Sequence, residues 1–281
     1  MSHYDPNAQA YGGYGYGQPT AVQQAQIDQG LRSYMVGVYN YMMIGLAITG
    51  LAALGIYMLS VTGDVNLAAR TARGAMRVAG GQYLTPFGAF LFASWFKFVV
   101  ILAPLGVVML LSFRADRLSA PAAQITFWVY AALVGVSMTT ILLVYAHTSV
   151  ARVFFITAAS FGALSLWGYT TKRDLSGMGT FLMMGLFGLI IAMLVNIGIA
   201  AFTGTPSTML QWIISVVGVL IFAGLTAYDT QNIKNEYIYS LAYANDGSIV
   251  QKAAIFGALQ LYMDFVGMFQ FLMSLLGQRD Q

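Results

Sequence analysis

The stretch Trp212-Ile-Ile-Ser-Val-Val-Gly-Val-Leu-Ile-Phe-Ala-Gly-Leu-Thr-Ala-Tyr-Asp229 decides the fold of this chain. It carries no charge before the aspartate that ends it, and it approaches the ~20 apolar residues that a helix needs to cross a ~30 Å hydrocarbon core. Backbone N–H and C=O groups cannot stay unpaired in lipid, so such a stretch is expected to be helical. It therefore predicts a membrane-spanning helix that ends in an acid.

The composition of the whole chain agrees with this prediction. Of its 281 residues, 58% are hydrophobic and 8% are charged, whereas a soluble domain has about 25% charged residues. A chain so poor in charge indicates a polytopic membrane protein in contact with the lipid bilayer. The net charge of +3 is small and scattered, which favours no nucleic-acid partner. The absence of cysteine excludes disulfides, thiolate metal sites and cysteine nucleophiles.

Working outward from this stretch, we find seven apolar segments of membrane-spanning length. They are uniformly apolar rather than alternating, which favours helices over an outer-membrane barrel. The predicted fold class is an all-α polytopic membrane protein with seven transmembrane helices. The segments cover roughly residues 34–61, 87–113, 121–145, 153–171, 178–202, 209–229 and 252–276.

The predicted domain organisation is a disordered tail at residues 1–30 followed by a transmembrane domain at 31–281. The tail contains Tyr11-Gly-Gly-Tyr-Gly-Tyr-Gly-Gln-Pro-Thr20 and a glutamine-rich segment, whose low hydrophobicity cannot repay the entropy of ordering. It has neither the basic start nor the apolar core of a secretory signal.

The distribution of Lys and Arg near the span ends favours a cytoplasmic N-terminus. That orientation places seven of them inside and five outside: Arg32, Arg114, Arg117, Lys172, Arg173, Lys234 and Lys252 against Arg70, Arg73, Arg77, Arg152 and Arg279. Arg70, Arg73 and Arg77 would share one face of a helix, so we expect an interfacial amphipathic helix there.

A second aspartate, Asp264, interrupts the last apolar segment. An acid at the centre of a lipid-embedded helix costs about 2.5–3.5 kcal/mol on insertion scales, which makes it a functional candidate. At 100° per residue, Gln260 and Asp264 share one arc of the last helix with Gly257, Gly267 and Ser274. On the sixth helix, Thr226 and Asp229 share an arc with Gln211, Ser215 and Gly218. Both stripes are expected to face protein rather than lipid.

The two helices that carry these acids are expected to be neighbours, because the loop between them is short. Asp229 is expected at the cytoplasmic end of its helix and Asp264 deeper in the membrane, so a kink or an offset would be needed to join them. If they meet, they would share one proton, and its loss would drive them apart and attract a hard cation such as calcium. The alternatives are an interfacial or capping role for Asp229 and a structural hydrogen-bonded role for Asp264.

Three motifs resemble the Bax inhibitor-1 family of transmembrane proteins, in its bacterial form. They are Gly224-Leu-Thr-Ala-Tyr-Asp-Thr-Gln-Asn-Ile-Lys234, Leu259-Gln-Leu-Tyr-Met-Asp-Phe-Val-Gly-Met-Phe269 and Gly168-Tyr-Thr-Thr-Lys-Arg-Asp-Leu-Ser-Gly-Met-Gly-Thr180. The resemblance implies a last helix wrapped by the other six, and a location in the bacterial inner membrane. It also implies a pH-sensitive calcium leak in which Asp229 and Asp264 form the sensor pair.

The resemblance further implies an arginine latch on the first aspartate, for which Arg114 and Arg117 are both candidates. Gln260, Thr226 and Tyr228 would form a supporting polar face. Some relatives carry an acid in the second span, where this chain has Lys97 instead, and this departure weakens the inference of identical ion conduction.

Three functions follow from these residues. The first is a non-enzymatic cation leak gated by protons at Asp229 and Asp264, with no cofactor other than a calcium ion bound there. The second is a non-conducting regulator of another membrane protein, such as the membrane-anchored protease that some bacterial relatives bind. The third and least favoured is an intramembrane aspartyl protease, since Tyr262 and Met263 precede Asp264 where that class has Gly-x-Gly.

Overall fold

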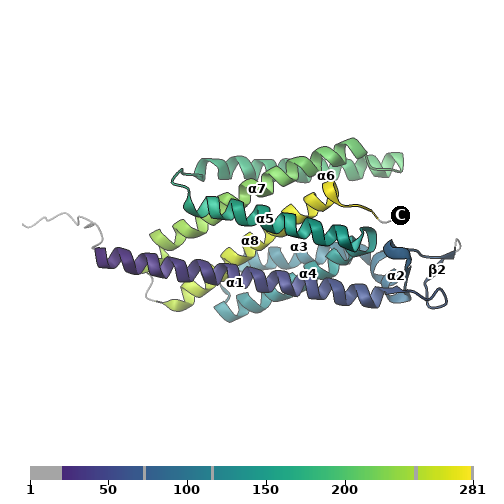
Figure 1. The fold of residues 1–281 in the computed structure, drawn as a ribbon, viewed down its shortest axis with the longest axis horizontal. Helices are drawn as coiled ribbons and strands as arrows, with labels where there is room; N and C mark the ends of the chain where they lie inside the picture. Colours follow the sequence, from purple (N-terminus) through teal and green to yellow (C-terminus); the bar gives the residue numbers. More distant parts are fainter. Residues whose placement is uncertain (1–20, 72–73, 115–116, 244–245, 280–281) are drawn as a thin grey trace, which may run out of the picture.

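The computed structural model describes residues 21–71, 74–114, 117–243 and 246–279 (Figure 1). Eight α-helices make up most of these residues. They are α1 (Ala21–Ser60), α2 (Pro86–Phe92), α3 (Lys97–Arg114), α4 (Ala120–Val144), α5 (His147–Thr170), α6 (Ser176–Thr203), α7 (Thr208–Tyr239) and α8 (Gly247–Leu276). The predicted all-α polytopic membrane fold is confirmed.

The number of spans depends on how α2 and α3 are counted. Within the described residues, six helices are long and apolar enough to cross a membrane, and α2 with α3 forms a seventh span only if this pair, bent by 58°, is taken as one. The prediction of one continuous helix over 87–113 is wrong. The Ser94 hydroxyl donates to Phe90 O (2.5 Å) and accepts from Phe96 N–H (3.1 Å), so it ends one helix and begins the next.

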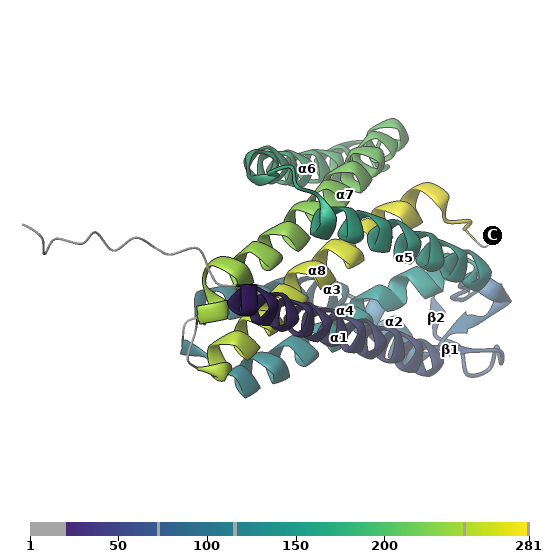
Figure 2. The same ribbon diagram turned by 60° about the vertical axis from the view of Figure 1, so that its left-hand side comes forward.

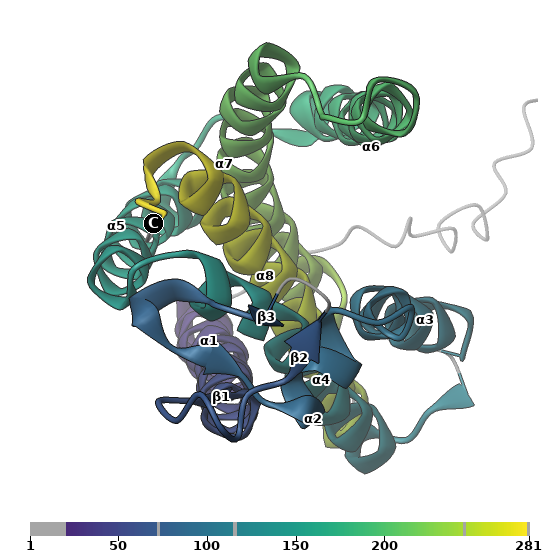
Figure 3. The ribbon, with the colours of Figure 1, turned by 90° about the vertical axis from the view of Figure 1, so that its right-hand side faces the viewer.

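The last helix lies at the centre of the bundle, as the end-on view shows (Figure 3). α8 packs against α1, α4, α5 and α7, whereas α3 packs mainly on α4 and α6 mainly on α7. Of the apolar window in each span, 67% is buried for α8 and 17% for α6. The helices around α8 therefore form an inner ring of four (α1, α4, α5 and α7) and two outer helices (α3 and α6).

Small residues allow the closest helix contacts. At Gly168 on α5, an added Cβ would lie 2.2 Å from the Ala227 carbonyl oxygen of α7. At Gly135 on α4, it would lie 2.4 Å from the Thr49 carbonyl oxygen of α1. Only glycine fits where two helix backbones approach this closely.

The segment between α1 and α2 is not the amphipathic helix that we expected. It contains the strands β1 (Val61–Thr62), β2 (Arg70–Thr71), β3 (Gly74–Ala75) and β4 (Tyr83–Leu84) and the short helix η1 (Ala79–Gly81), with β1–β4 and β2–β3 paired antiparallel. Gly80 (φ 73°) and Gly81 (φ 68°) adopt left-handed backbone that a helix cannot contain. Arg70 lies in β2 and Arg77 pairs with Tyr83, while Arg73 lies outside the described residues.

The long helices α1 and α7 (Figure 2) extend furthest beyond the apolar segments predicted for them. α1 begins at Ala21, within the segment predicted as tail, where alanine and glutamine are good helix formers. α7 continues to Tyr239, about three turns past Asp229. The rest of the predicted tail, residues 1–20, lies outside the described residues.

Candidate functional site: two buried acids between α7 and α8

Asp229 lies inside α7, not at a helix end. Its side chain is 4% exposed and α7 continues to Tyr239, so the expectation that the helix ends at Asp229 is wrong and a capping role does not fit. The helix continues because the next turns pack on protein: Gln231 and Ile233 are buried as well. Apolar character ends at Asp229, but burial does not.

The carboxyl groups of Asp229 and Asp264 lie close enough to share a hydrogen bond, and the Gln260 side chain also lies close to Asp229. Asp264 is 3% exposed, so the pair is enclosed by the bundle. The pair lies well inside the bundle because α7 continues beyond Asp229 and because α8 begins at Gly247, several residues earlier than predicted. The two acids therefore meet without the kink or offset that we expected to be necessary.

The contacts on either side of the pair run in regular antiparallel order. Toward the start of α8, Gly257 faces Ile233, with the position of an added Cβ 3.3 Å from that side chain. Toward its end, Gly267 faces the Phe222 ring and Phe271 covers Gly218. Beyond these, the Ser215 hydroxyl donates to Ser274 Oγ at 2.9 Å. The predicted stripes thus face one another along the whole interface.

A hydrogen bond between the two carboxyl groups would require a proton. An ionised carboxylate only accepts hydrogen bonds, so a bond between two carboxyl groups forms only when one of them is protonated. The Asp264 Oδ2 atom is buried and has no hydrogen-bond partner among the residues that the structure describes. The pair can therefore hold one proton and still present an unpaired oxygen.

The supporting residues predicted from the sequence separate into two groups. Gln260 lies at the pair, as described above. Thr226 is fully buried, but its hydroxyl donates to the Phe222 carbonyl of its own helix at 2.8 Å. Tyr228 packs over Gly179 of α6, where an added Cβ would lie 2.4 Å from its ring. Thr226 and Tyr228 therefore shape the surroundings of α7 rather than contact the acids.

The structure does not bring either candidate latch to the pair. Arg114, in the last turn of α3, and Arg117 are both exposed, and α3 packs on α4. The side chains that interact with Asp229 are those of Asp264 and Gln260. A latch would require movement of α3 or of α7.

The oxygen atoms at the pair suit a hard cation but do not enclose one. Calcium takes about six to eight oxygen ligands. Over the described part of the chain, no group of three or more His, Cys, Asp or Glu side chains could hold a metal ion. Asp229, Asp264 and Gln260 could supply a minority of the ligands, and water or backbone carbonyls would have to supply the others.

Sequence reasoning missed a set of hydroxyl and amide contacts next to Asp229. Thr230 bonds Ser165 of α5 (2.9 Å), which in turn bonds Tyr39 of α1 (2.6 Å). Gln231 accepts from Leu175 N–H (2.8 Å) and donates to Arg173 O (2.9 Å), which fastens the α5–α6 loop to α7. The signal was the position of Thr230 and Gln231 directly after the buried acid, within the motif already noted.

Together these features define a class: an all-helical integral membrane protein that buries a pair of neighbouring acids on its last two helices. Residues 31–281 match the protein family described as "Inhibitor of apoptosis-promoting Bax1". The chain belongs to this Bax inhibitor-1 family, as the sequence motifs indicated.

Relatives in bacteria resemble the chain over nearly its whole length. An uncharacterized protein of Rickettsia prowazekii is 40% identical over 260 residues, covering 92% of this chain and 95% of the relative. Inner membrane protein YbhL of Escherichia coli is 38% identical over 261 residues (93% and 98%). An uncharacterized protein of Deinococcus radiodurans is 36% identical over 258 residues (92% and 95%). These are bacterial-type members, and the names of the three relatives indicate no enzymatic activity.

Proposed function

We propose that this protein is a pH-sensitive cation leak, with calcium as the permeating ion, in which the proton shared by Asp229 and Asp264 acts as the gate. The observation that carries the proposal is the close approach of two buried carboxyl groups on neighbouring helices. Such a pair is expensive to place in a membrane, and a gate gives it a role.

The gate would open when the acid pair loses its shared proton. With the proton present, the carboxyl–carboxyl hydrogen bond holds α7 against α8. Without it, two negative charges about 4 Å apart repel by about 4 kcal/mol at an effective dielectric constant of about 20. The closed state binds one proton more than the open state, so acid favours closure and rising pH favours opening. The gate is therefore expected to open as the solution becomes more alkaline.

The ion follows from the chemistry of the opened pair. Two carboxylates and the amide oxygen of Gln260 are hard oxygen ligands, which calcium prefers. The site offers too few protein ligands to retain the ion, and weak coordination is what conduction requires. Selectivity for calcium over monovalent ions would come from the two charges.

Calcium flux into proteoliposomes, measured across a range of pH, tests this proposal. Wild-type flux is expected to rise with pH. Asp264→Asn keeps a hydrogen-bond donor facing Asp229 but carries no titratable group, so its flux should stay low at every pH. Asp64→Asn is the matched control, because Asp64 is exposed in the segment after α1. If Asp264→Asn conducts with the wild-type pH profile, the gate lies elsewhere.

A second candidate function, regulation of another membrane protein, has one observation in its favour. α6 packs mainly on α7 at the edge of the bundle and exposes large apolar side chains, among them Phe181, Met184 and Phe187. This face could bind the helix of a partner such as a membrane-anchored protease. Crosslinking in native membranes tests it: a partner adduct on α6 that persists in Asp264→Asn would support regulation without conduction.

The intramembrane aspartyl protease is the third candidate. It would use the same shared proton to activate water. Tyr262 stands two residues before Asp264 and is fully buried, with its hydroxyl 2.6 Å from Thr49 Oγ1. Helix packing therefore accounts for this position, and failure to cleave helical reporter substrates in detergent would remove the candidate.

A further inference from the structure

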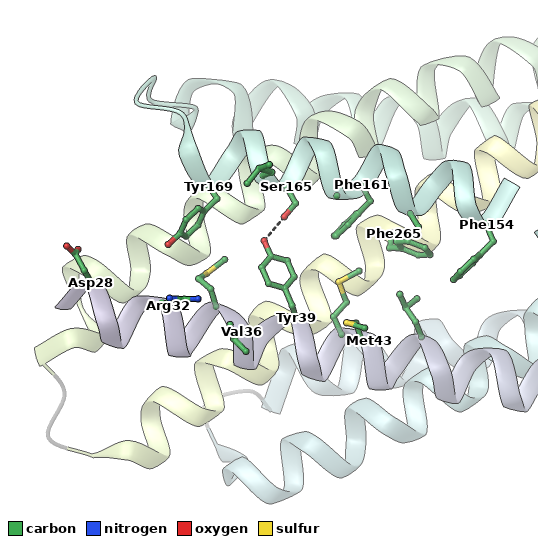
Figure 4. A pocket seen from close by; sticks show the side chains of 16 residues that line it. Asp28, Arg32, Val36, Tyr39, Met43, Phe154, Phe161, Ser165, Tyr169 and Phe265 are labelled. Atoms are coloured by element: carbon green, nitrogen blue, oxygen red, sulfur yellow. Dashed lines mark hydrogen bonds between the residues drawn. The ribbon is translucent and has the colours of Figure 1, made fainter. Parts of the chain in front are cut away.

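Two helices of the inner ring, α1 and α5, leave a long crevice between them (Figure 4). The crevice is open on one side, has a volume of about 1020 Å³ and runs along α1 from Asp28 to Leu46, opposite Phe154 to Tyr169 of α5. Phe265 of α8 forms part of its floor. Its volume is at the upper end of the about 300–1,000 Å³ that ligand pockets occupy.

A second cavity of about 360 Å³ continues the crevice along the same helix. The two cavities share Leu46, Phe154 and Phe265, and the second reaches Leu54 and His147. At 1.5 Å per residue, the distance along α1 from Asp28 to Leu54 is about 39 Å. A bilayer with its headgroups is about 40–45 Å thick, so the combined crevice is long enough to cover most of that thickness.

The interior of the crevice suits hydrocarbon chains. Most of its lining is apolar, and Met35, Met42 and Met43 are flexible side chains that adapt to irregular shapes. Its central polar contact is already satisfied, because the Tyr39 hydroxyl bonds Ser165 Oγ across the gap at 2.6 Å.

The charged residues of the crevice lie at one of its ends. Asp28 and Arg32 are exposed, line the crevice and stand one helical turn apart on α1 (Figure 4). Residues four apart lie on the same face of a helix, with Cβ atoms about 5–6 Å from one another. An arginine and an acid in this arrangement match adjacent phosphate and ammonium groups of opposite charge.

We propose that this crevice binds a phospholipid with an ethanolamine headgroup, its chains between α1 and α5, its phosphate on Arg32 and its ammonium on Asp28. An anionic lipid without the ammonium would place extra negative charge beside Asp28. The proposal is independent of conduction, since it rests on the crevice and its charges rather than on the Asp229–Asp264 pair.

Photo-crosslinking tests the site in the full-length protein. The probe is phosphatidylethanolamine with a diazirine in one acyl chain, supplied in phosphatidylcholine nanodiscs and mapped by peptide mass spectrometry. Gly162 lines the crevice and an added Cβ there meets no atom within 4 Å, so Gly162→Phe should fill the space without disturbing the fold. Gly188→Phe on α6 is the matched control, because its added Cβ also meets nothing.

Wild-type and Gly188→Phe protein are expected to carry the label on α1 and α5, and Gly162→Phe to lose it there. In competition, unlabelled phosphatidylethanolamine should displace the probe better than phosphatidylglycerol. Asp28→Asn should reduce that preference by about fivefold, the effect of one interfacial charge. Label spread evenly over all helices, label unchanged in Gly162→Phe, or protein–protein adducts in place of lipid would overturn the proposal. Equal competition by the two lipids would overturn the headgroup assignment.

Discussion

The α7–α8 interface and the α1–α5 crevice are built on opposite principles, although both border α8. Along α7–α8, a side chain of α7 packs against each glycine of α8 within the interface, and two acids are enclosed between the two helices. Between α1 and α5, Gly162 faces empty space and one hydrogen bond, Tyr39–Ser165, crosses the gap. Dense packing accompanies the two buried acids, and loose packing accompanies a mostly apolar lining.

The difference shows what holds a membrane bundle together. Lipid chains are as apolar as leucine, so helices associate through close packing and hydrogen bonds rather than through hydrophobic burial. Where small residues allow close contact, the helices can retain charged groups. Where they do not, lipid can enter between the helices.

The largest expected effect is that of replacing a glycine in the densely packed α7–α8 interface by a large residue. In Gly267→Leu the new side chain would meet the Phe222 ring, because an added Cβ already lies 2.4 Å from it. Overpacking of this kind costs about 1–3 kcal/mol. The melting temperature in detergent, measured by circular dichroism, should fall clearly.

The matched substitution on the loose side is Gly162→Leu. It makes the same chemical change in a helix but meets no atom within 4 Å of the Cβ position, so its melting temperature should stay at or above that of the wild type. Equal destabilisation by the two variants would show that the packing difference does not exist in solution.

A smaller effect is expected from the bond that crosses the crevice. Tyr39→Phe removes the hydroxyl contact with Ser165 and should lower stability by about 0.5–1.5 kcal/mol. The control is Tyr41→Phe, on the same helix, whose hydroxyl accepts a longer bond (3.3 Å) from the Gln251 amide at an exposed position. Detergent melting curves compare the two, and identical curves would mean that the Tyr39 bond does not hold α1 to α5.

Much of the dense interface could be predicted from the sequence. Helical periodicity placed Gln260 and Asp264 on one face of the last helix, and Asp229 with Gly218 on one face of the preceding helix. Small and polar residues on a largely apolar helix mark the side that faces protein, so the stripes were informative. The sequence also indicated that the helices are neighbours, because their loop is short.

The depth of Asp229 could not be predicted, for a physical reason. Hydropathy measures the preference of a segment for lipid, and the segment after Asp229 is polar. It is nevertheless helical and its first turn is largely buried, because Gln231 and Lys234 bond the α5–α6 loop and the end of α5. The crevice could not be predicted from the sequence either, since the lining residues of α1 and α5 have the same apolar character whether they touch one another or lipid.

The smallest expected effect concerns the start of α8, the helix that both regions share. Asp246 caps it by accepting a hydrogen bond from Ser248 N–H (2.8 Å), and this bond holds the pKa of the exposed carboxyl below its usual value. Because the folded-state pKa is lowered, the stabilisation is present above the ordinary carboxyl pKa and is lost as the pH falls through the lowered value. Asp246→Ala should therefore lower the melting temperature slightly at neutral pH, with the difference from wild type shrinking in acid. Asp246→Asn keeps the cap without the charge and should melt close to the wild type at neutral pH. A deficit in Asp246→Ala that is the same at acidic and neutral pH would mean that the ionised carboxylate contributes nothing to the start of α8.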